Sequence, residues 1–346
     1  MNMSKHGEIM MSEIRQTPEI FSKIISNDQI SAQLANLISD SAIHSVLILA
    51  RGTSDNAAHF LKYLVETQLG LPCGLTSPSS VSIYNSNLHY ERTLVVAISQ
   101  SGKSTDLVEF AKVSKASGAK LVSMTNDAHS PLAELADFHL SLQAGPELAV
   151  AATKSYSAQL LLSYLLVMKW AKKKPQIEEL VSQANALVAQ TDVIQDAVRS
   201  LDLNDELVVL GRGFAYPNAK EAALKIQETC KVSVHGMSTA DYQHGPISAL
   251  KKNSQVVLIA PCCMPKNSMV DAVEKIRKIT KKIYWIGSAA EVQPGEFKLG
   301  GACCSDEITS SIADAIILQE LALQLSVANG FNPDAPEGLS KVTMTI

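Results

Sequence analysis

This 346-residue chain lacks a hydrophobic run long enough to cross a bilayer. The longest apolar stretch, Leu160–Met168, is too short for a membrane span and is interrupted by Ser163 and Tyr164. The first residues carry charges, among them Glu8 and Arg15, and no apolar core typical of a signal peptide. We therefore expect a cytoplasmic protein that does not bind membranes.

The chain also lacks any excess of positive charge and any C-x-x-C motif. Its formal net charge is −4, so nothing favours nucleic acid as a partner, and an anionic ligand would have to be bound by local geometry. Six cysteines include the vicinal pairs Cys262-Cys263 and Cys303-Cys304, whose spacing is poor for a shared metal. We expect reduced, buried thiols and neither a metal nor an organic cofactor.

What the chain does contain is a serine-rich turn between a strand and a helix. The apolar, β-branched run Thr93–Ile98 predicts a buried strand, Asp106–Lys112 an amphipathic helix, and Ser99–Thr105 the turn between them. Free backbone N–H groups and the helix dipole favour an anion there, and hydroxyls add donors. We interpret the turn as a phosphate-binding cradle.

Two other interpretations of this turn compete. Gly102-Lys103-Ser104 looks like the end of a nucleotide P-loop, but Ala97 stands where that motif requires glycine. A serine that only caps a helix is the simpler alternative.

Strands alternate with helices along the first half, which predicts a parallel, doubly wound sheet. Residues 1–40 show helical patterning, with 1–10 as a possible disordered extension. The second half repeats the first at an offset of 161 residues, because Val46–Gly52 maps onto Leu207–Gly213 and two later strands keep the same register. The serine turn maps onto 260–264, which has lost the glycine and the hydroxyls. Only the first half can therefore cradle a phosphate, and Thr53 and Ser54, after a neighbouring strand, could reach the same anion.

The second half carries the charged chemistry. Glu221, Lys225 and Glu228 share one face of a helix predicted over 220–231. A surface ion-pair ladder is one interpretation, and a carboxylate positioned as a general base is the other. The polar stretch 234–246 resembles a functional loop, in which His244 precedes a Gly-Pro stop. The irregular tail ends with one central lysine, Lys341.

These motifs together resemble the sugar isomerase (SIS) family, specifically the isomerase half of glucosamine-6-phosphate synthase and its stand-alone deaminase relatives. The resemblance runs from about Met11 to the end of the chain. It rests on Arg51-Gly52-Thr53-Ser54, Ser99-Gln100-Ser101-Gly102-x-Ser104, Glu147 with Ala152-Thr153-Lys154, Gly211-Arg212-Gly213, Glu221-x-x-x-Lys225-x-x-Glu228, His244-Gly245-Pro246 and Leu339-Ser340-Lys341.

The resemblance implies a role for each motif. Glu228 would move a proton between C1 and C2, with Glu221 and Lys225 orienting it. His244 would open the sugar ring, reaching in from the second subunit of a homodimer, and Lys341 would lie by the open-chain sugar. The sugar phosphate would be held by six residues: Thr53, Ser54, Ser99, Gln100, Ser101 and Ser104.

The implied fold is α/β, with two tandem doubly wound SIS subdomains. The expected parts are an N-terminal segment 1–40, a first subdomain 41–175, a helical linker 176–204, a second subdomain 205–330 and a tail 331–346. The family's synthases carry a glutaminase domain in front, and no such domain is expected in the roughly forty residues before the first strand.

The expected reaction is therefore glucosamine 6-phosphate plus water giving fructose 6-phosphate plus ammonia. Galactosamine 6-phosphate deamination, fructosamine 6-phosphate deglycation and simple aldose–ketose isomerisation are alternative activities. A sugar-phosphate sensor without catalysis is the non-enzyme alternative.

Overall fold

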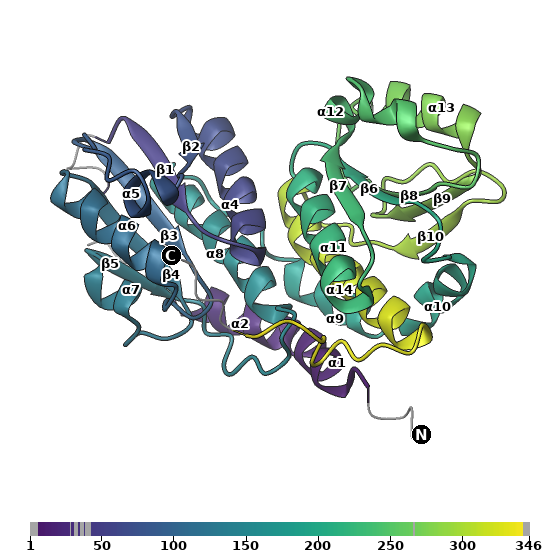
Figure 1. Ribbon diagram of the computed structural model, residues 1–346, viewed down its shortest axis with the longest axis horizontal. Helices are drawn as coiled ribbons and strands as arrows, with labels where there is room; N and C mark the ends of the chain where they lie inside the picture. Colours follow the sequence, from purple (N-terminus) through teal and green to yellow (C-terminus); the bar gives the residue numbers. More distant parts are fainter. Residues whose placement is uncertain are drawn as a thin grey trace. The chain divides into compact units, whose positions relative to one another are not determined.

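The computed structural model describes residues 6–27, 29, 30, 34, 38, 43–265 and 267–341 (Figure 1). Two parallel five-stranded sheets form the core of the described chain. The chain divides into two compact units, one comprising residues 1–19, 148–157 and 176–339, the other 20–147, 158–175 and 340–346. Each unit holds one sheet, which confirms the predicted α/β class with two doubly wound parallel sheets.

The first sheet has the strand order β2-β1-β3-β4-β5. Helices α4 and α8 lie on one side of it and α5, α6 and α7 on the other (Figure 1). Its strands are β1 (Ser45–Leu49), β2 (Cys73–Leu75), β3 (Thr93–Ile98), β4 (Lys120–Thr125) and β5 (Phe138–Ser141). Its helices are α4 (Thr53–Leu64), which continues as the π-helix η2 (Val65–Leu69), then α5 (Ser79–Ser82), α6 (Thr105–Ala116), α7 (Pro131–Leu135) and α8 (Lys154–Trp170).

The second sheet has the order β10-β9-β8-β6-β7. Its strands are β6 (Leu207–Gly211), β7 (Val234–Ser238), β8 (Gln255–Ile259), β9 (Lys282–Ile286) and β10 (Phe297–Gly300). Its helices are α9 (Leu180–Val188), α10 (Thr191–Ser200), α11 (Ala215–Cys230), α12 (Thr239–Gln243), the 3-10 helix η3 (Pro246–Ala249), α13 (Val270–Ile279) and α14 (Glu307–Ala328).

The two sheets have the same topology. Read from the other edge, the second sheet runs β7-β6-β8-β9-β10, which matches β2-β1-β3-β4-β5 strand for strand. The internal duplication predicted from the sequence register is therefore present in the fold. In this strand order the topological switch point lies between the first and third strands, and ligands of open parallel sheets bind at the carboxyl ends there.

The start of the chain is ordered further than expected. Helix α1 (Glu8–Arg15) is followed by α2 (Thr17–Ser26), and Asp334 of the tail binds the backbone at the start of α1. Its carboxylate accepts the N–H groups of Gly7 at 3.1 Å and Met10 at 2.8 Å. The expectation of a disordered extension is thus wrong for residues 7–10, because a carboxylate distant in sequence satisfies the orphan donors of the helix. The part of that expectation on residues 1–5, and the helical pattern at Leu37, lie outside the described residues.

Two further expectations need correction. Residues 234–238 form the edge strand β7 rather than a loop, because they pair in parallel with β6. The cysteines are not all reduced and buried: Cys262 and Cys303 form a disulfide across 41 residues, and Cys263 is exposed. Both vicinal pairs lie just after strands of the second sheet. Because they are far apart in the sequence, no local pattern could predict that they lie close together.

Helix α14 is long and apolar enough to cross a membrane by length and composition alone. Its most apolar window is 83% buried inside the protein, which is typical of a core helix.

Candidate functional site

The serine turn forms a compact loop between β3 and α6. Ser99 Oγ accepts the N–H of Gly102 at 3.1 Å, and Ser101 Oγ accepts the N–H of Lys103 at 3.3 Å. Gly102 has φ +65°, and an added Cβ would collide with the side chain of Ser130. Glycine is therefore required here for both conformation and space.

Two side chains of the cradle remain available to a ligand. Within the described part of the chain, the side chains of Gln100 and Ser104 make no hydrogen bond, and Ser104 occupies the N-cap of α6 without capping it. Arg51 is already ion-paired, because its Nε donates to the buried Asp106 in the first turn of α6 at 3.0 Å. The cradle would therefore bind an anion through amide N–H groups and hydroxyls.

Thr53 and Ser54 begin α4, directly after β1. Since β1 pairs with β3 in parallel, with Leu49 opposite Ala97, the starts of α4 and α6 lie at the same edge of the sheet. Ser54 is buried, and its Oγ accepts from Gln159 of α8 at 3.0 Å. The predicted phosphate-binding residues thus gather at the switch point of the first sheet.

The charged face of α11 is not a surface ladder. The side chains of Glu221 and Lys225 are 0% and 1% exposed, and Glu228 is 24% exposed. Lys225 Nζ lies 3.5 Å from Glu221 Oε1 and forms an ion pair with Glu228 Oε2. A cation held between two carboxylates is costly to bury, which makes this cluster a candidate functional site.

We call Glu221, Lys225 and Glu228 the α11 triad. The hydroxyl of Tyr156 lies near its buried carboxylate, Glu221. Tyr156 is fully buried and donates to Asn218 Oδ1 at 2.9 Å. Burial, and then the nearby Glu221 carboxylate, raise the pKa of Tyr156 well above its ordinary value, so the phenol stays protonated.

His244 forms no hydrogen bond or ion pair with the α11 triad. It follows α12 as its C-cap, it is exposed, and its ring makes no hydrogen bond to the described residues. Gly245, with φ +155°, then turns the chain into η3. An imidazole fixed on a turn and open to solvent can reach a ligand or a second molecule.

Lys341 pairs with a buried carboxylate. Its Nζ lies 3.2 Å from Oε2 of Glu147, whose side chain is 0% exposed, and both residues belong to the unit that holds the cradle. Sequence reasoning used Glu147 only as a family marker and missed it as a partner of Lys341. The two residues are far apart in the chain, so no local pattern could have linked them.

The segment after Glu147 is held by the first helix. Glu13 of α1 accepts the N–H groups of Leu148 and Ala149, the first at 2.5 Å. Lys154, which is 2% exposed, donates to Gln16 at 2.8 Å and lies 3.9 Å from Glu13. Buried charges in such a network fix the path of residues 148–154.

Over the residues that the structure describes, no group of three or more His, Cys, Asp or Glu side chains could hold a metal ion.

The sequence of this chain is similar to known proteins. Residues 41–169 match the model of the SIS domain. The chain is 31% identical, over 346 residues, to the glutamine–fructose-6-phosphate aminotransferase (isomerizing) of Pyrococcus horikoshii. The alignment covers 97% of this chain and 57% of that relative, so the chain spans little more than half the relative's length.

Two solved structures have a similar fold. One is the C-terminal domain of glucosamine-fructose-6-phosphate aminotransferase from Francisella tularensis, with a TM-score of 0.85 and 22% identity over 96% of this chain and 98% of that one. The other is glucosamine-6-phosphate deaminase from Thermotoga maritima, with a TM-score of 0.77 and 22% identity over 98% and 100% of the two chains. At these identities the likeness concerns the fold.

Proposed function

The chain belongs to the SIS domain family through residues 41–169, and from that premise we propose that it is an amino sugar phosphate isomerase that releases ammonia. Its substrate would be glucosamine 6-phosphate, and the products would be fructose 6-phosphate and ammonia. The observation that carries the proposal is the α11 triad, in which a buried lysine holds a partly exposed glutamate.

The phosphate of the substrate would supply binding energy at a distance from the reacting carbons. Amide N–H groups of the serine turn and the hydroxyls of Ser101, Ser104 and Thr53 would hold the dianion. Remote binding of this kind fixes the position of C1 and C2, so part of the entropic cost of reaction is met on binding.

Glu228 would then act as the base. It would take the proton from C2 of the open-chain aldose and return it to C1, while one proton of the C2 ammonium passes to O1, which leaves a hydroxyl on C1 and an iminium at C2. Water adds to C2, and ammonia leaves, so glucosamine 6-phosphate and water are converted to fructose 6-phosphate and ammonia with all atoms accounted for. Lys225 would hold the carboxylate in place and Glu221 would hold Lys225.

Ring opening and stabilisation of the open chain need separate groups. We assign ring opening to His244, contributed by the second subunit of a homodimer, because its exposed imidazole contacts none of the described residues of its own chain by hydrogen bond. Lys341, paired with Glu147, would lie at the open-chain sugar. We expect the enzyme to act in the cytoplasm.

The test is ammonia release from glucosamine 6-phosphate by the wild-type protein and by Glu228→Gln. We expect the variant to lose activity by at least about a hundredfold while retaining phosphosugar binding. The matched control is Glu274→Gln, an exposed glutamate of α13 in the same unit, which should keep full activity. Full activity of Glu228→Gln would refute the assignment.

The choice of substrate is tested in the same assay. Ammonia from galactosamine 6-phosphate instead would keep the mechanism and change the sugar. Ammonia from neither sugar, with tight binding of a sugar phosphate, would refute the deaminase proposal in favour of a deglycase or a sensor.

A further inference from the structure

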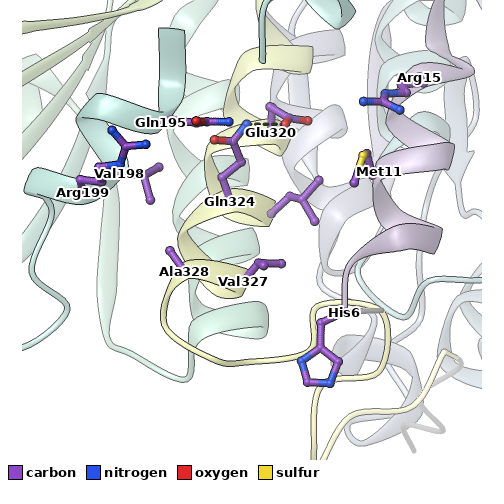
Figure 2. A pocket seen from close by; sticks show the side chains of 11 residues that line it. His6, Met11, Arg15, Gln195, Val198, Arg199, Glu320, Gln324, Val327 and Ala328 are labelled. Atoms are coloured by element: carbon purple, nitrogen blue, oxygen red, sulfur yellow. Dashed lines mark hydrogen bonds between the residues drawn. The ribbon is translucent and has the colours of Figure 1, made fainter. Parts of the chain in front are cut away.

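A cavity in the second-sheet unit is lined by none of the site residues proposed above. It has a volume of about 470 Å³, within the range usual for small-molecule sites, and lies between α1, α10 and α14 of one compact unit (Figure 2). Its lining comprises His6, Met11, Arg15, Gln195, Val198, Arg199, Glu320, Leu323, Gln324, Val327 and Ala328. None of the cradle residues, the α11 triad, His244 or Lys341 is among them.

A buried carboxylate forms part of the wall. Glu320 of α14 is 8% exposed, and its one hydrogen bond to the described residues comes from Gln324 Nε2 at 2.6 Å. Burial raises the pKa of Glu320, while the Gln324 bond and the charge of Arg15 oppose that shift. A carboxylate accepts about four hydrogen bonds, so Glu320 keeps unused acceptor capacity at the cavity wall.

One cationic side chain and one amide side chain face this carboxylate from the other helices. Arg15 of α1 and Gln195 of α10 point toward Glu320 across the cavity (Figure 2). Within the described residues, Arg15 makes no hydrogen bond and no ion pair within 4.0 Å. Arg199 is on the rim, where its Nη1 pairs with Asp196 at 3.0 Å. The charge of Arg15 acts on Glu320 without a direct ion pair, so the N–H groups of its guanidinium can still donate to a phosphate or carboxylate group.

The remaining wall is apolar. Met11, Val198, Leu323 and Val327 offer hydrocarbon surface beside these polar groups. A ligand that satisfies all three parts has an anionic group for Arg15, a carbon skeleton for the apolar wall, and an ammonium or hydroxyl donor for Glu320.

We propose that this cavity is a second ligand site, which binds a phosphorylated amino sugar through Arg15 and Glu320. The cavity and its two charged groups stand independently of the proposed function, whereas the choice of an amino sugar among such ligands rests on it. Helix α14, which lines the cavity, also contacts α11. The hydroxyl of Ser326 on α14 donates to the carbonyl of Thr229, the residue after Glu228, at 2.9 Å.

The experiment is equilibrium dialysis of glucosamine 6-phosphate with the full chain carrying Glu228→Gln, so that the probe is not consumed. We expect two molecules bound per chain. Adding Arg15→Gln should weaken one of the two sites at least about tenfold, since it removes a charge-assisted contact to the ligand. Arg15 is exposed and makes no hydrogen bond to the described residues. Glu320→Gln should weaken the same site.

Two further variants locate the sites. Lys252→Gln removes one exposed positive charge of the same unit away from the cavity and should leave both sites intact. Gln100→Ala with Ser104→Ala should weaken only the cradle site.

Each result is decisive. A single site, lost in the cradle variant and unaffected by Arg15→Gln, would overturn the second site and leave the proposed function standing. A single site lost in Arg15→Gln and unaffected by the cradle variant would support the cavity and count against the proposed function. Two sites that both ignore Arg15→Gln and Glu320→Gln, or no binding at all, would overturn the proposal.

Discussion

Replacing Lys225 by methionine removes the cation that lies 3.5 Å from the fully buried Glu221. Methionine has similar length, so the main effect is electrostatic: a buried carboxylate loses its lysine partner. Breaking a buried ion pair from one side costs about 3–5 kcal/mol, a large part of the roughly 5–15 kcal/mol that stabilises a typical domain.

The double variant Glu221→Gln with Lys225→Met separates charge from packing. Removing both charges leaves no uncompensated ion, so most of the lost free energy of unfolding should return. Activity should not return, because Glu228 still lacks the lysine that holds its carboxylate. Urea unfolding and ammonia release would be measured on the same preparations.

The reasoning fails if the single and double variants are equally destabilised, since the buried charge would then not be the cause. It also fails if the double variant regains both stability and activity. In that case Lys225 would be a structural group without influence on Glu228.

Three other predictions follow from buried carboxylates and from the cradle. Asp334→Asn should lower the free energy of unfolding by about 1.5–3 kcal/mol, because an ionised acceptor of the N–H groups of Gly7 and Met10 is lost; an unchanged thermal midpoint would contradict this. Gln100→Ala with Ser104→Ala should raise KM for the sugar phosphate about tenfold with a smaller effect on kcat, and an effect on kcat alone would count against a binding role. Burial raises the pKa of Asp314 from 3.8 to about 7, so the native state pays a cost that grows as pH rises from about 4 to 7 and reaches about 4 kcal/mol above that range. Asp314→Asn should therefore gain stability over the parent as pH rises through this window, and a pH-independent difference in urea unfolding would refute the assignment.

The strands that carry long apolar runs could be predicted from the sequence. Residues of β3 are all buried, and their β-branched pattern marks them clearly. The edge strands β2 and β7 were missed, because Cys73–Leu75 is only three residues long and β7 includes His235 and Gly236. Edge strands are held by pairing with a neighbour, which single-sequence patterns do not record.

In the candidate site, too, the local pattern could be predicted from the sequence and the packing could not. The spacing of Glu221, Lys225 and Glu228 placed them on one helical face, but it could not tell a solvated face from a buried one. Burial depends on what packs against α11, and α14 comes almost eighty residues later in the chain.

Partners distant in sequence were beyond local reasoning altogether. Glu13 with Leu148, Lys341 with Glu147 and Cys262 with Cys303 are contacts that only the folded chain brings together. Each joins segments that have no shared pattern of residues.

The proton transfer assigned to Glu228 can be followed with glucosamine 6-phosphate deuterated at C2. If Glu228 moves the C2 proton to C1, ammonia release should show a primary isotope effect, and part of the deuterium should appear at C1 of fructose 6-phosphate. Glu228→Gln should release no ammonia from the labelled substrate. An aldose product that keeps its deuterium at C2 would mean that water displaced the amine directly, and the isomerase mechanism would be wrong.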